Sequence, residues 1–189
     1  MKRLVCLAML CTAVLAPRAA HAQDDAEARP ASLSLRPFGD GAIGVWYRLS
    51  PRTELGLEVG GSRSHTETDG GGDEQDATTF TIEPAVKRFG ASRNNLQPYA
   101  FGSLYFTSQK VDYTSSFETA TTLFGTHLGL GLEWTPAARV RIGGHTGVRV
   151  AMQNGERTQF DAGGNPFVAD VEGWEVGTFT SGLTFYYSF

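Results

Sequence analysis

Cysteine is scarce in this sequence, and its placement argues against a disulfide-stapled domain. The 189 residues contain two cysteines, Cys6 and Cys11, and both lie in the first 22 residues. That segment is expected to be removed after export, so the mature chain is predicted to contain no cysteine. Small secreted domains often depend on disulfides for stability. The absence therefore weakly favours another kind of exported protein.

Long apolar runs are also missing once the N-terminal segment ends. Lys2 and Arg3 precede an apolar stretch at 4–16, and Ala20-His21-Ala22 places small residues at the two positions that a signal peptidase reads. This three-part layout is typical of a cleaved secretory signal. The apolar stretch is shorter than the roughly 20 residues that a membrane-spanning helix needs, which disfavours the alternative of a helical anchor.

We therefore predict three segments: a signal peptide at 1–22, a short flexible lead-in at 23–30, and one domain at 31–189. Because the sequence closes on Phe189, we expect no peptidoglycan-binding domain after the domain at 31–189.

An excess of basic residues is lacking as well. The formal net charge is −4, and three of the 16 Lys and Arg residues fall in the predicted signal peptide, which has no acidic residue. The mature chain is therefore more acidic still. Nucleic-acid binding needs clustered Lys and Arg to neutralise phosphates. We predict no nucleic-acid partner.

Catalytic and cofactor motifs are absent too. The sequence has no HExxH, GxSxG or phosphate-binding loop, and the predicted mature chain keeps three histidines, at 65, 127 and 145. His127 and Glu133 form the nearest acid–base candidate, but six residues along one strand separate them by about 20 Å. Asp69, Asp73, Glu74 and Asp76 lack the spacing of a calcium-binding EF-hand loop, and a solvated loop is the favoured interpretation. We predict no enzyme activity, no cofactor and no metal.

Period-two alternation is what the sequence does contain. Between residues 126 and 134, Leu128, Leu130, Leu132 and Trp134 alternate with His127, Gly129, Gly131 and Glu133. This period places alternate side chains on opposite faces of a β-strand. Eight such segments are predicted, at 31–38, 41–49, 53–65, 77–89, 96–109, 120–134, 138–152 and 173–189. In the fifth segment the apolar face is ambiguous, because Tyr99, Phe101 and Tyr105 compete with Ala100, Leu104 and Phe106.

The connections between these segments alternate in length. Short turns are predicted at 50–53, 90–95 and 135–138, and long polar loops at 65–77, 110–119 and 153–172. Short turns at one end and long loops at the other are typical of outer-membrane barrels, whose short turns lie in the periplasm.

Glycine, small polar residues and spaced charges lie opposite the apolar face. If the apolar face meets lipid, these charges point into the lumen, where they need partners because an isolated buried charge is costly. We predict that they form a structural network that plugs the lumen. The nine predicted members are Arg48, Glu58, Glu83, Lys87, His127, Glu133, Arg141, His145 and Arg149.

A soluble protein would solvate the same charges. The alternative is therefore a periplasmic β-barrel or sandwich that turns Leu128, Leu130 and Leu132 inward and binds a small apolar ligand.

Aromatic residues fall near both ends of the predicted strands, as expected for the two belts of a membrane protein. The predicted periplasmic belt contains Tyr47, Phe89, Tyr99, Trp134, Tyr187 and Phe189. The predicted outer belt contains Tyr105, Phe106, Phe124 and Trp174.

The last ten residues form the most specific pattern. Thr180, Gly182, Phe185, Tyr187 and Phe189 fall where the C-terminal assembly signal of outer-membrane barrels has a polar residue, a glycine, alternating hydrophobic residues and a terminal aromatic. Phe179 and Leu183 are predicted to extend the same lipid-facing row. In architecture and tail, the chain resembles the small outer-membrane barrels of the OmpA/OmpX type over nearly its whole mature length.

This resemblance implies an all-β fold, an eight-stranded antiparallel up-and-down transmembrane β-barrel. It also implies outer-membrane lipid and the outer-membrane assembly machinery as partners. The function expected is a non-enzymatic role in envelope structure or surface interaction, with a narrow pore for small solutes as the alternative. The sequence names no partner for the outer loops.

Overall fold

The structure, a computed structural model, describes residues 30–37, 41–66, 75–113, 117–160, 165–181 and 183–189. The predicted signal peptide, almost all of the predicted lead-in, and Gly182 lie outside the described residues. No helix in the described part of the chain is long and apolar enough to cross a membrane.

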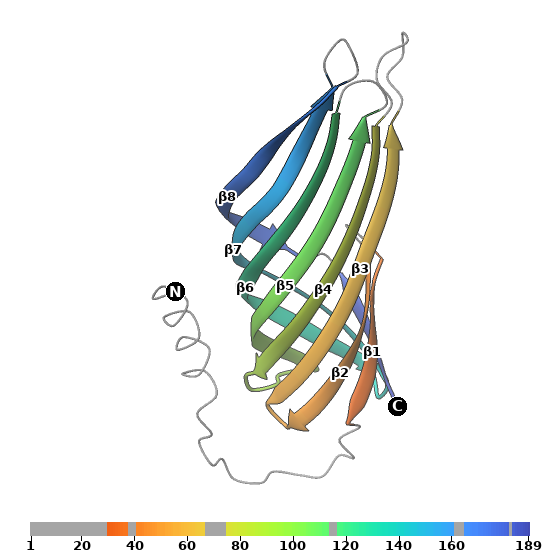
Figure 1. Cartoon of the computed structure of the whole chain (residues 1–189). Coiled ribbons are helices and arrows are strands. Elements are labelled where there is room, and N and C mark those ends of the chain that lie inside the picture. The colour runs from red at the N-terminus through yellow and green to blue at the C-terminus, as the bar shows by residue number, and fades with distance from the viewer. Residues whose placement is uncertain (1–29, 38–40, 67–74, 114–116, 161–164, 182) are drawn as a thin grey trace.

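One antiparallel sheet curls into a tilted barrel (Figure 1). Its strands are β1 (Ala31–Arg36), β2 (Ala42–Ser50), β3 (Thr53–Thr66), β4 (Gln75–Phe89), β5 (Leu96–Tyr113), β6 (Phe117–Ala137), β7 (Val140–Phe160), β8 (Pro166–Thr180) and β9 (Thr184–Ser188). Consecutive strands pair from β1 to β8, and β9 lies between β7 and β1 and closes the ring. The up-and-down order predicted from the sequence is confirmed.

The last predicted strand, 173–189, is interrupted near Ser181. Thr180 pairs with Thr146 and Thr184 pairs with Gly143, so four steps along β8 and β9 match three along β7. The extra residue is a β-bulge, which reverses the face of every following residue. Phe179 therefore points into the lumen, and its predicted place in the lipid-facing row is wrong.

The turns are short, as predicted, at the end of the barrel that is drawn at the bottom of Figure 1, here called the lower end. Between Arg93 and Leu96, which form a bridge, Asn94 and Asn95 both have positive φ, at 52° and 62°. A two-residue turn with this geometry matches the twist of a hairpin, and Asn tolerates it well.

Strands β5 to β8 reach further at the upper end than the sequence pattern indicates. Most of the predicted loop at 153–172 is paired β-strand, because β7 and β8 pair as far as Phe160 and Pro166. Apolar alternation stops where the outward face becomes polar, although the backbone pairing continues. The predicted upper loop was too long for this reason.

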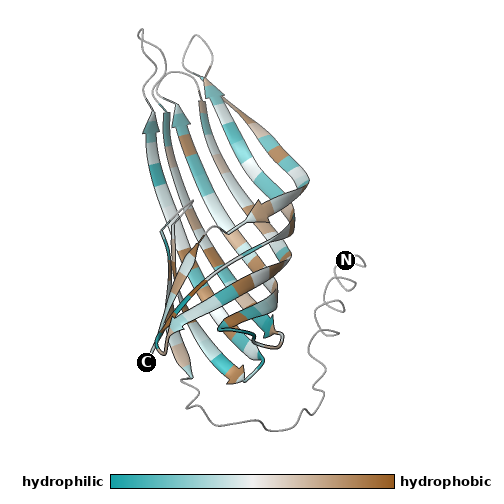
Figure 2. Cartoon of the chain, turned by 180° about the vertical axis from the view of Figure 1, so that it is seen from behind, coloured by the Kyte–Doolittle hydropathy of each residue, from teal (hydrophilic) through white to brown (hydrophobic). Residues whose placement is uncertain are grey.

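Hydrophobic residues are concentrated in the lower barrel, and the upper strand ends are mostly hydrophilic (Figure 2). Many of the lower apolar side chains are exposed on the outside. Leu130 is 71% exposed, and its outward neighbours Leu128 and Leu132 are also exposed. The inside of the barrel holds charged, polar and aromatic side chains instead. This is the reverse of a soluble protein, whose apolar side chains face inward.

The ambiguous face of β5 is settled by the register. Tyr99, Phe101 and Tyr105 are buried in the lumen. They lie opposite Gly131, Gly129 and Gly125 on β6. A Cβ at Gly131 or Gly125 would overlap the ring of Tyr99 or Tyr105, so these two glycines leave room for the rings.

Three residues that were predicted to belong to the two aromatic belts, two on β5 and one on β4, face the lumen instead. Tyr99, Tyr105 and Phe89 are lumen residues. The other members lie on the outer surface.

Candidate functional site

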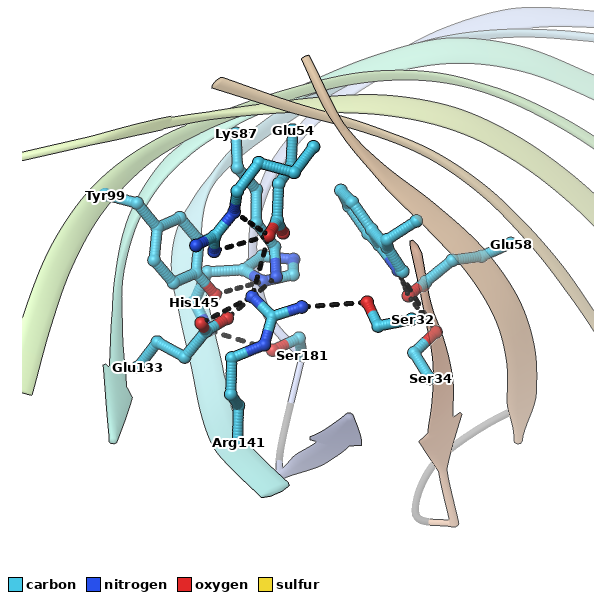
Figure 3. Close-up of polar contacts among 12 residues, drawn as sticks. Ser32, Ser34, Glu54, Glu58, Lys87, Tyr99, Glu133, Arg141, His145 and Ser181 are labelled. Atoms are coloured by element: carbon cyan, nitrogen blue, oxygen red, sulfur yellow. Dashed lines mark hydrogen bonds and ion pairs between the residues drawn. The ribbon is translucent and has the colours of Figure 1, made fainter. Parts of the chain in front are cut away.

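The lower lumen holds a group of charges centred on Glu54, here called the lower cluster: Arg48, Glu54, Lys87, Glu133 and Arg141. All but Arg48, which is half-buried, are buried, and these four are labelled in Figure 3. Glu54 Oε1 lies 2.6 Å from Arg48 Nη2 and 2.8 Å from Arg141 Nη1. Arg141 Nη1 also lies 2.7 Å from Glu133 Oε1, and Lys87 Nζ lies 3.3 Å from Glu133 Oε2. Each charge thus has an opposite charge nearby, which buried ions need.

Lys87 has no exposed surface, and aromatic rings surround its ammonium group. Its Nζ lies 4.3 Å from the ring centre of Trp46, 4.8 Å from that of Tyr99 and 3.9 Å from that of Tyr186. Ring faces attract cations, and the attraction is stronger where water is excluded. The rings and Glu133 together replace the water that an exposed lysine would bind.

Above this lies the upper cluster, formed by Arg36, Glu58, Glu83, Ser103 and His127. Glu58 accepts hydrogen bonds from the Ser34 hydroxyl and the Trp46 indole, and Arg36 lies 3.3 Å away. Glu83 contacts His127 Nδ1 at 2.7 Å and the Ser103 hydroxyl at 2.5 Å. Arg36 approaches Glu83 at 3.9 Å and so links the two carboxylates.

Stacked rings flank both lumen histidines, the buried His145 and the partly buried His127. His127 lies between Tyr105 and Phe179, with ring centres 4.4 Å from each. His145 stacks on Phe101 at 3.8 Å, and its Nδ1 is 3.2 Å from the Tyr99 hydroxyl. With the two clusters, these rings line the interior of the lower barrel.

Three buried side-chain nitrogen or oxygen atoms in the described part of the chain have no hydrogen-bond partner: Glu54 Oε2, Arg141 Nε and Arg149 Nε. Two of them belong to the lower cluster. A buried polar atom without a partner has a cost of about 1–3 kcal/mol. The lower cluster therefore has many ion pairs and hydrogen bonds, but two of its buried polar atoms lack a hydrogen-bond partner.

Eight of the nine lumen residues predicted from the sequence lie in or beside these clusters. Arg149 is the exception: it is higher in the barrel and pairs with Glu175 on β8.

Sequence reasoning missed two charged members. Glu54 is at the centre of the lower cluster, and strand parity could have found it because it shares the face of Glu58. Arg36 lies on β1, whose short alternation gave little signal.

The upper cluster contains serine, histidine and glutamate, yet lacks the geometry of a catalytic triad. Ser103 Oγ and Glu83 Oε1 both approach Nδ1 of His127, at 3.4 and 2.7 Å. In a triad the two ring nitrogens divide these roles, one facing the nucleophile and the other the acid. The serine hydroxyl here donates to Glu83 instead.

His127 and Glu133, the acid–base candidate from the sequence, have different partners. Glu133 contacts Lys87 and Arg141, whereas His127 contacts Glu83. Among the described residues, no group of three or more His, Cys, Asp or Glu could hold a metal ion. Asp69, Asp73 and Glu74 lie outside the described residues.

At the upper end the outer surface carries charged pairs in place of apolar side chains. Lys110 Nζ lies 3.0 Å from Glu118 and 3.1 Å from Asp112. The hydrogen bond that Lys110 donates to Glu118 is the largest of the effects that raise the pKa of the Lys110 ammonium group.

In the predicted assembly tail, Phe185, Tyr187 and Phe189 point outward and are exposed. Thr180 is also exposed on the outer face. Gly182 lies outside the described residues.

Neither a known family model nor a curated protein matches the sequence. The fold, however, matches solved structures. A major outer membrane protein from Thermus thermophilus superposes with a TM-score of 0.58 at 15% identity, over 84% of this chain and 98% of that one. Neisserial surface protein A superposes with a TM-score of 0.50 at 13% identity, over 84% of this chain and 93% of that one. At these identities the likeness shows the fold, an eight-stranded barrel of the small outer-membrane type.

Proposed function

We propose that this protein is a non-enzymatic barrel of the bacterial outer membrane, with a role in envelope structure or surface interaction. The observation that carries the proposal is the inverted distribution of side chains. Leu128, Leu130 and Leu132 face outward, whereas Lys87 and Glu54 are buried inside. The outward leucines suit contact with lipid hydrocarbon, whereas the charged side chains inside the barrel must be kept out of it.

The soluble alternative requires the opposite facing. A periplasmic protein that binds a small apolar ligand would turn these three leucines toward its interior. Their exposure would then leave a broad apolar surface in water, which soluble monomers rarely have. The membrane is the better-supported environment.

We infer further that the lumen is plugged. Trp46, Lys87, Glu54, Glu133, Tyr186 and Thr184 are the largest fully buried side chains, and all six point into the lower lumen. An eight-stranded barrel has an interior just wide enough for side chains to fill. This packing supports a structural lumen over the alternative of a narrow pore.

The surface role rests on the upper strands. Beyond Phe124 and Met152 the outward residues of β6 and β7 are Thr122, Ala120, Asn154 and Glu156, which suit water or lipid headgroups more than hydrocarbon. We propose that this part of the barrel faces the cell exterior. The exposed tail residues Phe185, Tyr187 and Phe189 would serve recognition by the outer-membrane assembly machinery.

Cell fractionation with a heat-modifiability gel tests the location. The protein should appear in the outer-membrane fraction and migrate differently when it is not boiled, because an intact barrel resists unfolding in detergent. Recovery in a soluble periplasmic extract would refute the membrane proposal.

Conductance measurements in a planar bilayer test the plug separately. The purified, folded barrel should give no large single-channel conductance. A large, regular conductance would favour the pore and leave the membrane location intact.

A further inference from the structure

The wall of the barrel is incomplete in its upper half. The β2–β3 ladder ends where Ala42 pairs with Gly60, so within the described residues the segment 61–66 of β3 pairs with β4 alone. On the other side, β7 is the only described partner of β8, along all 15 of its residues. Figure 1 shows β3 and β8 at the two margins of the upper sheet, with β1 and β2 confined below.

Each margin is an open sheet edge among the described residues. Backbone N–H and C=O groups on such an edge are available to pair with another strand, and proteins usually cover or block them. The free segment of β3 is about as long as a typical strand, which has 5–6 residues. β8 also carries Trp174, whose 77% exposure is the highest of the large apolar side chains described.

The two edges differ in charge. β8 contains Asp170, Glu172 and Glu175 and no Lys or Arg, whereas the segment 61–66 contains Arg63 and His65 and no acid. Glu175 is paired with Arg149 inside the barrel. Within the described residues, Asp170 and Glu172 form no ion pair, so the outward acidic side chains of β8 stay available.

Arg63 is also available to a partner, although it is not isolated. Its side chain is 76% exposed, and its contact with Asp76 is long, at 3.9 Å. Asp76 also contacts His65 at 3.0 Å. Arg63 and Asp170 lie on one continuous row of paired residues that crosses the upper sheet through Thr78, Lys110, Ala120 and Glu156. Both side chains therefore point to the same, outer face.

We propose that the open edges are an interface between two copies of this chain, in which β8 of one copy pairs with the 61–66 segment of β3 in the other. This proposal rests on the proposed membrane location, because insertion holds the two barrel axes parallel. β3 runs toward the upper end and β8 runs away from it, so β3 and the partner's β8 would be antiparallel. A two-fold axis along the membrane normal forms both contacts at once, which makes the assembly closed.

Pairing of β8 with the partner's β8 is less favourable. It would place acids beside acids, and like charges on neighbouring strands are destabilising. The same two-fold axis would also make the two strands parallel. Only the β3–β8 combination brings Arg63 beside Asp170 and Glu172 of the other copy.

Crosslinking between two differently tagged copies tests the interface. One copy carries Ser64→Cys and the other carries Val171→Cys; both positions lie on paired strands of the described barrel, and the described residues contain no native cysteine. Cells that express both copies are treated with a short bis-maleimide. A crosslinked band that carries both tags is expected, and its absence from correctly folded, heat-modifiable protein would overturn the interface but not the membrane location.

Charge reversal gives the matched control. Arg63→Glu in both copies should abolish the two-tag band, and Asp170→Arg with Glu172→Arg added to both copies should restore it. Arg52→Glu, in an exposed lower turn, should leave the band unchanged. If Ser64→Cys and Val171→Cys placed together in one chain give only a crosslinked monomer, the edges close within one barrel and the proposal is wrong. Crosslinks only to a different protein would overturn it equally.

Discussion

Arg141 Nη1 lies 2.8 Å from Glu54 Oε1 inside the barrel, although 87 residues separate the two in the sequence. The same Nη1 atom lies 2.7 Å from Glu133, and Nη2 donates to Ser32 at 2.8 Å. One guanidinium group therefore joins β7 to β6, β3 and β1. By its hydrogen bonds Arg141 links more strands than Arg48, which donates to Glu54, or Lys87, which donates to Glu133.

Arg141→Met should destabilise the barrel strongly. The change leaves Glu54 and Glu133 buried with less compensation, and breaking a buried ion pair by removing one partner typically costs about 3–5 kcal/mol. Urea unfolding in lipid vesicles, followed by tryptophan fluorescence, measures the loss. Arg139→Met is the control, since Arg139 is exposed and its guanidinium group donates to the Tyr187 hydroxyl at 3.3 Å. Equal losses for the two variants would contradict a special role for Arg141.

A charge on the outside of the barrel should destabilise it only within the apolar, lipid-facing surface of the lower barrel. Leu130→Arg places a cation on the most exposed leucine of β6, and a cation near the bilayer centre costs about 2–4 kcal/mol. The matched control is Ala120→Arg, which is outward on the same strand but above the belt. Folding into lipid vesicles should fail or weaken for the first variant alone. A protein that tolerates both changes equally would not be embedded in lipid at Leu130.

Glycines opposite the lumen rings should resist substitution. A Cβ at Gly131 would overlap the Tyr99 ring, and a Cβ at Gly173 on the β8 edge would meet nothing within 4 Å. Overpacking typically costs about 1–3 kcal/mol, so Gly131→Ala should lower the unfolding free energy by that amount. Gly173→Ala should be neutral or slightly stabilising, because it restricts the unfolded chain. The reverse order in unfolding midpoints would show that the β5 rings are not packed as described.

The bulge at Ser181 should depend on its hydroxyl. Ser181 Oγ accepts a hydrogen bond from the His145 backbone N–H at 2.9 Å, which the interrupted ladder would otherwise leave unmet. Ser181→Ala removes this acceptor and should cost about 1–3 kcal/mol. Thr180→Ala, one residue away on the exposed face, serves as the control. Hydrogen exchange should show faster exchange of the His145 amide in Ser181→Ala only, and unchanged protection would contradict the role of the hydroxyl.

The architecture was predictable because lipid and lumen impose opposite chemistry on neighbouring residues. Leu128, Leu130 and Leu132 alternate with His127, Gly131 and Glu133, and that contrast survives in the sequence as a two-residue period. Above the belt both faces are polar, so the period fades although the β7–β8 ladder continues. The upper strand ends could not be located from hydropathy for this reason.

The interior was less predictable where a residue type suits both faces. Tyr99 and Tyr105 fit lipid as well as a lumen, and the glycines opposite them on β6 leave room for their rings in the lumen. Phe179 was misplaced because a one-residue bulge is invisible to strand parity. The partners of each charge follow from closure of the ring, which brings Arg141 to Glu54, and no local pattern encodes that.

Ring closure also sets a time order for folding. The seam joins β1 to β9, the first and last strands of the chain, and its ladder runs only from Ser32 to Leu35 on one side and from Phe185 to Ser188 on the other. Contacts between distant parts of a chain form late, because the loop between them must first be ordered. The barrel can therefore close only after the last strand has been delivered. The same short seam is the natural place for the closed ring to begin to open.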